Sequence, residues 1–374
     1  MQFNLWLLIC FSTASLYATE LTSNFKVGLD KVMQHYVANT GLWVDKDCVL
    51  SGGCAGDRGL WYWANAIHLL VDYQNLTGDR LYYAKELHNT YAKNKTLVIG
   101  RNYFDDDGWW ALSFIALYQL THKKAYLTSA EKLAEDMYQR GAQNVCYGSG
   151  GIYWDAKKTQ VGSIANELYL AVNAKLYLLT LQPKYKMRAN DSWNWFKHSG
   201  LLNSDYTIDD NYTVVNGKCG IKVGWKFTYT HGVILSGLVD LAKINHDPSL
   251  GVMAQNIAKR AMYNFSLGGI LTETCTNVDS CADDAFLFKG IFVYNLAYLA
   301  SNALDKVFIN QVQQYLTDNY TQLLANQSSL NDYGFNWSLA VDKNKNSPVY
   351  NPADIVTQLS ALYLIDANLF LHQQ

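Results

Sequence analysis

The chain has 374 residues, of which 49% are hydrophobic and 14% aromatic, and its net charge is -2. This apolar content is enough for a large core, which excludes a disordered chain. Because 30 Lys and Arg nearly balance 32 Asp and Glu, we expect no nucleic acid and no membrane surface as partner, and a neutral or small substrate fits better.

The first 18 residues are typical of a secretory signal peptide. An uncharged, mostly apolar stretch runs from Leu5 to Tyr17, and the small residue Ala18 precedes Thr19. The stretch is too short to span a bilayer, which takes about 20 apolar residues. We therefore expect residues 1–18 to be removed on export, leaving a secreted protein with one domain over 19–374.

Helical spacing of apolar residues dominates the mature chain, and its four prolines lie between the apolar stretches. Twelve helices are predicted, at 23–39, 59–76, 79–93, 106–121, 124–140, 161–180, 185–199, 227–245, 249–264, 282–302, 304–324 and 352–371. The last of these is a closing helix and not a lipid-anchor signal.

A short repeat marks three of the helix–helix turns. Leu-Thr, four variable residues and Tyr recur at 76–82, 120–126 and 179–185, each at the end of one helix and the start of the next. Twelve helices in six hairpins predict an all-α fold, a closed (α/α)6 toroid, with an open solenoid as the alternative. The longer irregular stretches would rim a central cleft, at 40–58, 141–160, 200–226, 266–281 and 325–351.

Three consecutive carboxylates, Asp105, Asp106 and Asp107, lie at the start of the helix predicted at 106–121. An acidic helix cap would need one or two of them. Calcium binding is a further alternative, although its ligands usually alternate along the chain. The third interpretation is catalytic, with Asp105 and Asp106 as the pair that glycosidic bond cleavage requires.

Glycosidic cleavage with retention needs a nucleophile and an acid about 5 Å apart, which neighbouring residues at a helix start can provide. The helix dipole would keep one Asp ionised, while like charge and aromatic walls would raise the pKa of the other. Tyr103, Phe104, Trp109 and Trp110 would supply those walls.

Cysteine usage agrees with export. Removal of Cys10 with the signal leaves six cysteines, an even number. Cys48–Cys54 and Cys275–Cys281 would close short loops, and elimination then pairs Cys146 with Cys219. The alternative is six free thiols. No C-x-x-C motif occurs, so we expect no zinc site.

The order Tyr-aromatic-Asp-Asp-x-x-Trp-Trp at 103–110 resembles the signature of glycoside hydrolase family 76, the endo-α-1,6-mannanases and their cell-wall transglycosidase relatives. The resemblance continues along almost the whole mature chain. It includes segments 61–66, 149–154, 164–168, 227–232, 288–292 and 357–361, in family order.

The resemblance implies a six-hairpin toroid and retaining hydrolysis of internal α-1,6-mannosidic bonds, with Asp105 as nucleophile and Asp106 as general acid/base. Asp107 falls at a variable position and would be a helix cap or a charge that tunes the pair. The expected substrate-binding residues are Tyr103, Trp109, Trp154, Tyr229 and His231. At Thr230-His231 the family more often has Asn-Gln, so His231 could contact a sugar hydroxyl or be structural.

Other interpretations remain open. Asp209-Asp210 would be a solvated turn, and Asp283-Asp284 a helix cap that could also reach the cleft. Metalloprotease, nucleotide-binding and G-x-S-x-G motifs are all missing, so we expect no metal and no cofactor. The alternative functions are transglycosylation on mannose-containing glycans, a non-catalytic glycan-binding protein, and another toroid enzyme such as an epimerase. We expect a monomer.

Overall fold

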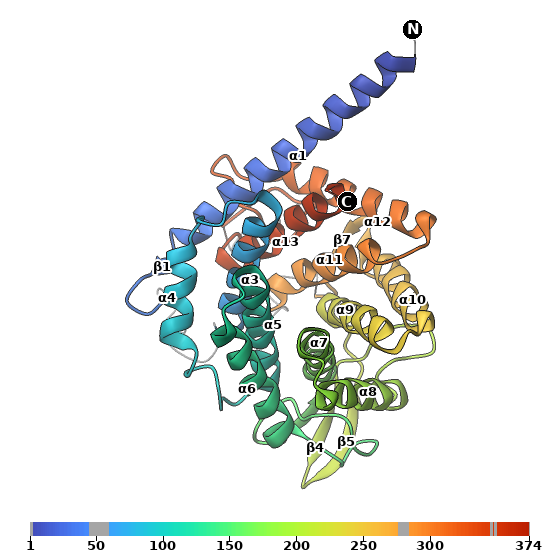
Figure 1. Cartoon of the computed structure of the whole chain (residues 1–374). Helices are drawn as coiled ribbons and strands as arrows, with labels where there is room; N and C mark the ends of the chain where they lie inside the picture. The colour runs from blue at the N-terminus through green and yellow to red at the C-terminus, as the bar shows by residue number, and fades with distance from the viewer. Residues whose placement is uncertain (1–2, 45–59, 276–283, 345–346, 348–349, 374) are drawn as a thin grey trace.

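The computed structural model describes residues 3–44, 60–275, 284–344, 347 and 350–373. Six of its helices form an inner ring, in which each helix packs on the next and the last packs on the first (Figure 1). They are α3 (Leu60–Thr77), α5 (Phe104–Thr121), α7 (Ser163–Thr180), α9 (Thr228–Asn245), α11 (Ala285–Ser301) and α13 (Ile355–His372). Contact between α13 and α3 closes the ring, so the predicted toroid is confirmed and the open solenoid is not.

Six further helices lie outside the ring. They are α1 (Phe3–Met33), α4 (Ala84–Asn94), α6 (Lys124–Gly141), α8 (Pro183–His198), α10 (Pro248–Asn264) and α12 (Lys306–Ala325). Helix α1 packs against both α13 and α3, where the two ends of the chain meet. Its first turns project beyond the ring (Figure 1).

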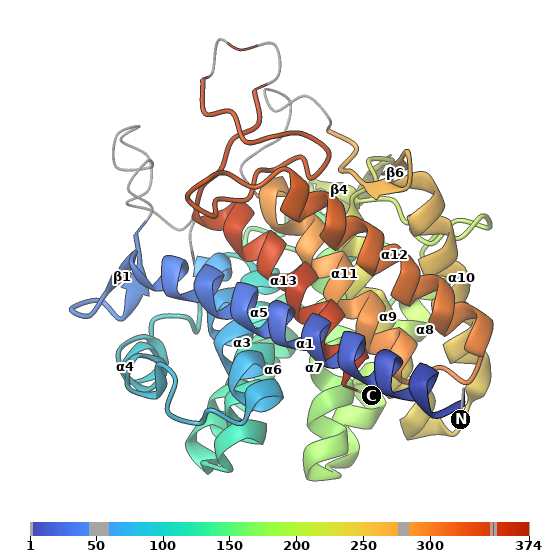
Figure 2. The same ribbon diagram turned by 90° about the horizontal axis from the view of Figure 1, so that it is seen from above.

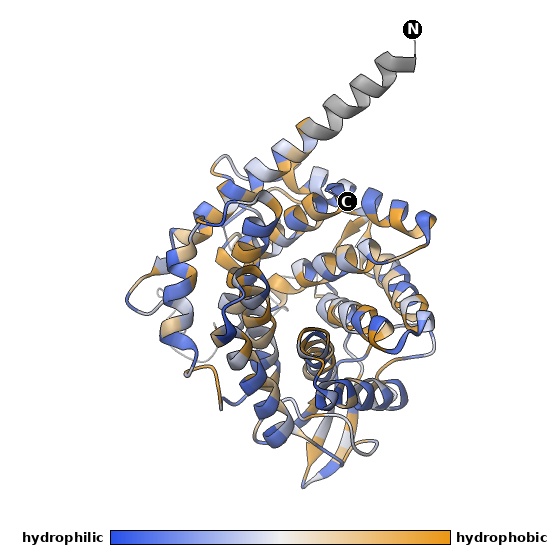
Figure 3. Ribbon diagram, in the orientation of Figure 1, coloured by the Kyte–Doolittle hydropathy of each residue, from blue (hydrophilic) through white to orange (hydrophobic). Residues whose placement is uncertain are grey.

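Burial explains why the sequence divides into two kinds of helix. Inner helices are covered on almost every side: all residues from Ala285 to Val293 of α11 are buried. Outer helices bury one face only, and Figure 3 contrasts hydrophobic residues along α3 and α5 with hydrophilic stretches on α8. By length and composition α13 alone among the described helices could cross a membrane, but 89% of it is buried in the protein, as a core helix requires.

The inner helices run parallel and approach one another closely. A Cβ at Gly232 of α9 would lie 2.7 Å from Phe292 Cα of α11, and one at Gly290 of α11 would lie 2.7 Å from Ser360 Cα of α13. A real side chain cannot approach a neighbouring backbone so closely, so glycine is required at both contacts. All six amino ends therefore point to one end of the toroid, where the long loops also gather (Figure 2).

The Leu-Thr-x4-Tyr repeat is a recurring turn, as predicted. In each copy the Thr hydroxyl donates to the carbonyl four residues earlier, at 2.6 Å for Thr77, 2.6 Å for Thr121 and 2.7 Å for Thr180. The next residue is left-handed in all three, namely Gly78, His122 and Leu181. The closing Tyr is then buried in the core: Tyr82, Tyr126 and Tyr185.

Short strands occupy regions that the sequence left as loops. Three antiparallel strands form a sheet in the order β3 (Gln160–Gly162), β4 (Asn211–Val215) and β5 (Lys218–Val223), with Val161 opposite Tyr212 and Tyr212 opposite Lys222. A predicted disulfide, Cys146–Cys219, ties β5 to the loop after α6 and is confirmed. The hairpin β6 (Ser266–Leu267) and β7 (Ile270–Leu271) follows α10.

Three predicted helix boundaries were wrong, the first because α1 begins at Phe3 and not at residue 23. The helix predicted over 23–39 ends at Met33, and β1 (Tyr36–Val37) pairs with β2 (Leu42–Trp43) around a turn in which Gly41 has a φ of 69°. The helix predicted from 79 begins at Ala84, after a turn that ends with Tyr83 in a left-handed conformation. Cys275 is also disulfide-bonded, whereas Cys48, Cys54 and Cys281 lie outside the described residues.

Candidate active site

A cleft of about 840 Å³ lies at the amino ends of the inner helices. Five of the six inner helices contribute a residue from their first turns to its wall: Trp61, Asp105, Ile164, Tyr229 and Ala285. Trp109 of α5 and Phe288 of α11 also line it. Loops and the three-stranded sheet contribute Trp154, Gln160, Asp210, Asn211, Trp225, Lys226, Phe227, Thr274 and Cys275. The positive ends of parallel helix dipoles thus converge on one cavity, which favours negative charge there.

Asp105 is held in this cleft by two neighbouring segments of backbone. Residue 104 begins α5, and its N–H donates to the carbonyl of Trp154 (2.9 Å). The same loop places the Trp154 indole N–H 2.8 Å from Asp105 Oδ2. The backbone N–H of Asp106 donates to Asp105 Oδ1 (3.1 Å). Both oxygens of Asp105 thus accept hydrogen bonds that favour its ionised form.

The two carboxyls differ in what surrounds them. Burial raises the pKa of Asp105 to about 7, against the lowering effect of its hydrogen bonds from Trp154 and Asp106. Burial and the charge of Asp105 raise the pKa of Asp106 well above its usual range, and Arg101 opposes this rise. Asp106 is therefore the carboxyl that holds its proton more strongly.

A third carboxylate, Asp284, lines the same cleft. It accepts hydrogen bonds from the Trp61 indole (3.1 Å) and from the Tyr62 hydroxyl (2.6 Å). Its charge raises the pKa of both Asp105 and Asp106. Asp284 makes no side-chain cap bond to α11, so the cap interpretation was wrong and the cleft alternative is correct. Like Asp105 it stands at the start of an inner helix, a signal already present in the sequence.

Asp107 faces away from the cleft. It makes no cap bond, since the α5 cap position is Tyr103 and has none, so the cap interpretation was wrong. Asp107 is fully buried between α5 and α6, where burial and the neighbouring carboxyl of Asp136 raise its pKa well above the usual range. That environment favours a neutral carboxyl.

Aromatic rings line the cleft on several sides. The Trp109 ring lies 5.6 Å from that of Trp61, and Tyr229 stacks on Phe288 at 3.7 Å with nearly parallel planes. Trp225 is 68% exposed at the rim. Flat apolar faces with polar edges are suited to sugar rings. Trp225 and Phe288 were missed in the sequence because neither stands out locally from the other aromatics.

Tyr103 and His231 were expected to contact substrate, but neither is among the residues that line the cleft. The Tyr103 ring packs on Trp154 at 4.6 Å and so supports that side chain. His231 is fully buried: Nδ1 bonds the carbonyl of Phe227 (2.8 Å) and Nε2 accepts from the N–H of Ile208 (2.9 Å). With both ring nitrogens engaged by backbone, His231 has the structural role that the sequence left open.

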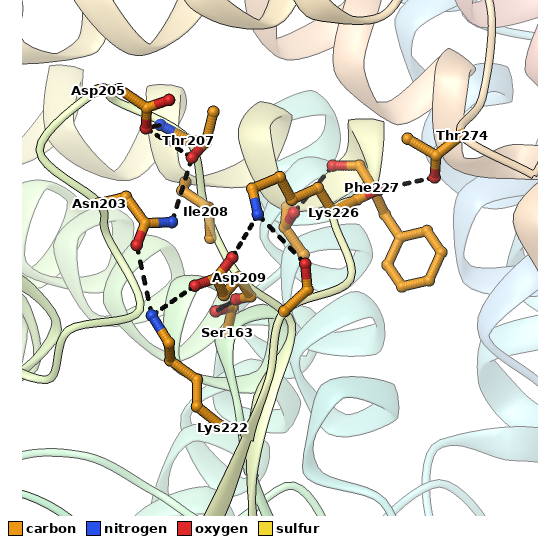
Figure 4. A network of polar contacts seen from close by, with 12 residues as sticks. Ser163, Asn203, Asp205, Thr207, Ile208, Asp209, Lys222, Lys226, Phe227 and Thr274 are labelled. Atoms are coloured by element: carbon orange, nitrogen blue, oxygen red, sulfur yellow. Dashed lines mark hydrogen bonds and ion pairs between the residues drawn. The ribbon is translucent and has the colours of Figure 1, made fainter.

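Asp209 and Asp210 are not a solvated turn, so that interpretation was wrong. Figure 4 shows Asp209 between Lys222 and Lys226, each with its ammonium group 2.6 Å from a carboxylate oxygen. Asp210 lines the cleft and accepts from the Asn211 side chain (2.7 Å). The clamp on Asp209 fixes the segment that carries Trp225, Lys226 and Phe227 along the wall.

One more carboxyl lies behind this wall. Glu167 of α7 is fully buried, neither of its oxygens has a hydrogen-bond partner, and its pKa is raised by burial and by Asp210. Within the described residues no three His, Cys, Asp or Glu side chains gather as a metal site. What the geometry offers is acid–base and nucleophilic chemistry by carboxyl groups in a cleft walled by aromatic rings.

Comparison with known proteins gives a consistent result. A family model described as glycosyl hydrolase family 76 matches residues 22–374. A candidate mannan endo-1,6-alpha-mannosidase of Schizosaccharomyces pombe is 22% identical over 211 residues, which are 53% of this chain and 47% of the relative. The chain spans about half the length of that relative.

Solved structures share the fold. The α-1,6-mannanase GH76A from Salegentibacter sp. HEL1_6 has a TM-score of 0.81 and 22% identity, with 94% of this chain and 99% of that chain covered. An inactive variant of it, with two consecutive aspartates replaced by asparagine, was solved with α-1,6-mannotriose (TM-score 0.80, 22% identity, the same coverage). Dfg5 from Chaetomium thermophilum, in complex with glucosamine, has a TM-score of 0.80 and 18% identity, with 94% and 90% covered.

Proposed function

Because this chain belongs to glycosyl hydrolase family 76, we propose that it hydrolyses internal α-1,6-mannosidic bonds of a mannan backbone with retention of configuration. That it is a glycoside hydrolase follows from the family; the bond, the endo mode and the stereochemistry are the proposal. The observation that carries it is the Asp105–Asp106 pair at the amino end of α5, inside an aromatic cleft.

In the first step Asp105 attacks the anomeric carbon of the bound mannosyl unit. The bond from that carbon to the glycosidic oxygen breaks, Asp106 gives its proton to this oxygen, and a mannosyl ester of Asp105 forms. The division of roles is supported by the hydrogen bonds to both Asp105 oxygens and by the stronger rise in the pKa of Asp106.

In the second step Asp106, now ionised, takes a proton from water. The water oxygen, which this proton transfer makes more nucleophilic, attacks the anomeric carbon, and the ester bond to Asp105 breaks. Two successive inversions leave the configuration unchanged. Asp106 ends protonated and Asp105 ionised, so the pair is ready for another turnover.

Aromatic residues on both sides of the pair would hold the mannose units. We propose Trp154, Trp109 and Tyr229 as platforms, together with Trp61, Trp225 and Phe288. An open cleft with walls from several helices suits an internal bond of a polymer, since chain can extend past the pair in both directions. The inactive double-aspartate variant of the Salegentibacter mannanase supports a paired role for Asp105 and Asp106.

The test is incubation of the mature protein with unbranched α-1,6-mannan, following product sizes and anomeric configuration over time. Short α-configured manno-oligosaccharides, formed before any accumulation of mannose, would support the proposal. Products that are initially β-configured would overturn the retaining mechanism, and release of mannose alone would overturn the endo mode.

A second candidate is transglycosylation, in which a sugar hydroxyl replaces water in the second step. The acidic residues Asp210 and Asp284, which line the cleft beside the pair, favour an acceptor with a protonated amine, and the similar Dfg5 was solved with glucosamine. Products longer than the starting chains, formed when an amino-sugar acceptor is added, would favour this reaction over hydrolysis.

We also propose that the protein is exported and that residues 1–18 are removed. One finding supports export: the Cys146–Cys219 bridge suits an oxidising compartment. Amino-terminal sequencing of protein recovered from the culture medium tests this, with Thr19 as the expected first residue.

A further inference from the structure

A second polar cavity, here called the axial cavity, lies at the carboxyl ends of the inner helices. It consists of two adjoining spaces of about 170 Å³ and 180 Å³, which share Asp72, Asn75, Tyr294 and Tyr298 on their walls. Trp109 lines both the first space and the catalytic cleft, so this ring separates the two sites. Asn75 and Gln119 are exposed and open the axial cavity to solvent.

The charges around the axial cavity do not balance. Its one lysine, Lys175, is bound to Asp240 at 3.0 Å, and Asp240 also accepts from Tyr298 (2.6 Å) and lies 3.6 Å from Lys243. These groups therefore compensate one another. Two further carboxyls on the wall, Asp72 of α3 and Asp366 of α13, remain to be accounted for.

Within the described residues neither Asp72 nor Asp366 forms an ion pair with a lysine or arginine, although the charge of Lys175 acts on Asp72 from a distance and favours its ionised form. Asp366 is only 2% exposed, and neither its Oδ1 nor Asp72 Oδ2 has a hydrogen-bond donor. His68 lies close to one of them, with its Nε2 4.0 Å from Asp72. Burial lowers the pKa of His68 to about 3, so this imidazole is neutral and does not offset either carboxylate.

The dipoles of the inner helices add further negative charge to the axial cavity. Parallel inner helices place six carboxyl ends, each with a partial negative charge, around this end of the toroid. A cation in the axial cavity would thus meet the negative ends of the dipoles, and it would favour the ionised forms of Asp72 and Asp366, whose pKa values are raised by burial. The catalytic cleft has the reverse polarity of dipoles, although it too is acidic.

The walls identify the kind of cation. One end of the second space is apolar, formed by Leu76, Ala297, Ala367 and Phe370, which would be a poor shell for a hydrated metal ion. The Tyr294 ring on the wall is an aromatic group of the kind that attracts organic cations. Its 180 Å³ corresponds to about six water molecules at roughly 30 Å³ each, which suits a short carbon chain.

We propose that the axial cavity binds a small aliphatic ammonium ion, with the ammonium group between Asp72 and Asp366 and the carbon chain against Ala367 and Phe370. The site is separate from the catalytic cleft. Its occupancy stabilises the folded ring because the ligand joins α3, the first inner helix, to α13, the last.

The test uses the mature protein and n-butylammonium chloride, with the Tm measured by scanning fluorimetry at about pH 9. Burial raises the pKa of Asp72 to about 7 and that of Asp366 well above its usual range, while an alkylammonium group is still charged at this pH. We expect a saturable rise of a few degrees. Equal concentrations of 1-butanol and of sodium chloride should not produce it. No saturable rise, or an equal rise with sodium chloride, would overturn the proposal.

Variants locate the site. Asp366→Asn should abolish the rise, whereas Asp318→Asn, which changes an exposed aspartate on α12, should keep it. Asp105→Asn should also keep it, because the catalytic cleft is a different acidic site. If Asp366→Asn does not fold, Ala367→Leu fills the apolar end without changing charge and should abolish the rise. A rise retained in both Asp366→Asn and Ala367→Leu would place the ligand elsewhere.

Discussion

Asp105 and Asp106 are adjacent in the chain but occupy different surroundings, and this difference predicts how each variant should fail. Asp106→Asn removes the acid, so mannan turnover should fall by about 10²–10⁴-fold. An aryl α-mannobioside with an acidic phenol as leaving group needs no proton in the first step, so it should lose much less. Steady-state kinetics on both substrates measure the difference.

Asp105→Asn removes the nucleophile and should abolish turnover of both substrates alike, on the order of 10⁴-fold or more. Asp318→Asn serves as the surface control and should keep wild-type rates. If Asp105→Asn were the variant spared on the activated substrate, the two roles would have to be exchanged.

Asp284 predicts a change in the pH dependence of catalysis. Its negative charge disfavours ionisation of both Asp105 and Asp106, so Asp284→Asn should lower both pKa values. Activity needs Asp105 ionised and Asp106 protonated, and therefore both limbs of the kcat/KM profile should move to lower pH. The amide oxygen of Asn can still accept from Trp61 and Tyr62, and a profile unchanged from wild type would contradict this role for Asp284.

For single residues, the sequence predicted a place in the catalytic site where the neighbouring residues in the chain indicated it. Asp105 and Asp106 stand out because their carboxylates are consecutive, at a helix start and among aromatics. Asp210 and Trp225 join them only through the closing of the ring, over more than 100 residues of chain. Nothing adjacent to His231 indicates that its ring would bond the backbone of Ile208.

Among the elements, the repeated turn allows a comparison within one protein. The left-handed position after Thr is Gly78 in the first copy and Leu181 in the third, where the side chain is 70% exposed. Leu181→Gly should relieve the left-handed penalty and raise the free energy of unfolding by about 0.5–1 kcal/mol. Denaturant unfolding measures it.

Leu178 provides the matched control. It lies in the same helix, α7, is 42% exposed and has helical backbone, so Leu178→Gly should destabilise by about 1 kcal/mol. Destabilisation in both variants would show that the Leu181 contacts outweigh its backbone strain.

Loss of the disulfide that holds the β4–β5 hairpin should affect substrate binding more than the chemical step. Cys146–Cys219 closes a loop with a sequence separation of 73, and replacing both cysteines by serine should cost about 2–5 kcal/mol of stability. Because the strand β4 and the segment after β5 carry Asn211, Trp225 and Lys226 of the cleft wall, KM for mannan should rise more than kcat falls. A double-serine variant with the KM of the wild type would show that the disulfide does not position the cleft wall. Reducing agent cannot replace the variant, because Cys275 is also disulfide-bonded.

The positions of the inner helices were predictable from the sequence because a helix inside the ring is buried on nearly all sides and is therefore apolar along its length, as in α11. Strands β3, β4 and β5 were not, since they are short and their residues do not alternate regularly between buried and exposed: most of β3 and the start of β4 are buried, whereas β5 is mostly exposed. The overextended helix at 34–39 failed for a similar reason: its residues are apolar enough for a helix, but Gly41 allows a hairpin turn that brings Tyr36 beside Trp43.

For the whole molecule, buried carboxyls set how stability changes with pH. Burial raises the pKa of eight of them: Asp72, Asp105, Asp106, Asp107, Glu167, Asp210, Glu273 and Asp366. Between the unfolded and folded pKa values the native state holds more protons than the unfolded chain, so stability falls as pH rises. The buried histidines His68 and His231, with lowered pKa values, act in the opposite direction but are fewer.

The free energy of unfolding should therefore be greater near about pH 5 than near about pH 7.5, when measured in denaturant at constant ionic strength. Asp107→Asn should reduce the slope, because Asp107 is buried outside the cleft and its amide analogue does not titrate. A stability that rises steadily over this range would mean that these carboxyls are ionised in the native state.

The packing of α1 against α13 gives the toroid a property of its topology. Beyond residue 18, α1 still packs on α13, since a Cβ at Gly28 would clash with the Leu362 side chain, so these two helices lie side by side while the inner helices form an unbroken circle. The covalent chain is interrupted at one point of this circle only, where its termini lie, and the packing of the ring does not depend on where the termini are. Circular permutation would join the ends by a short linker and open the chain at an exposed turn such as the one after Thr180. We expect the permuted protein to keep the cleft, because the same ring forms whichever hairpin is synthesised first.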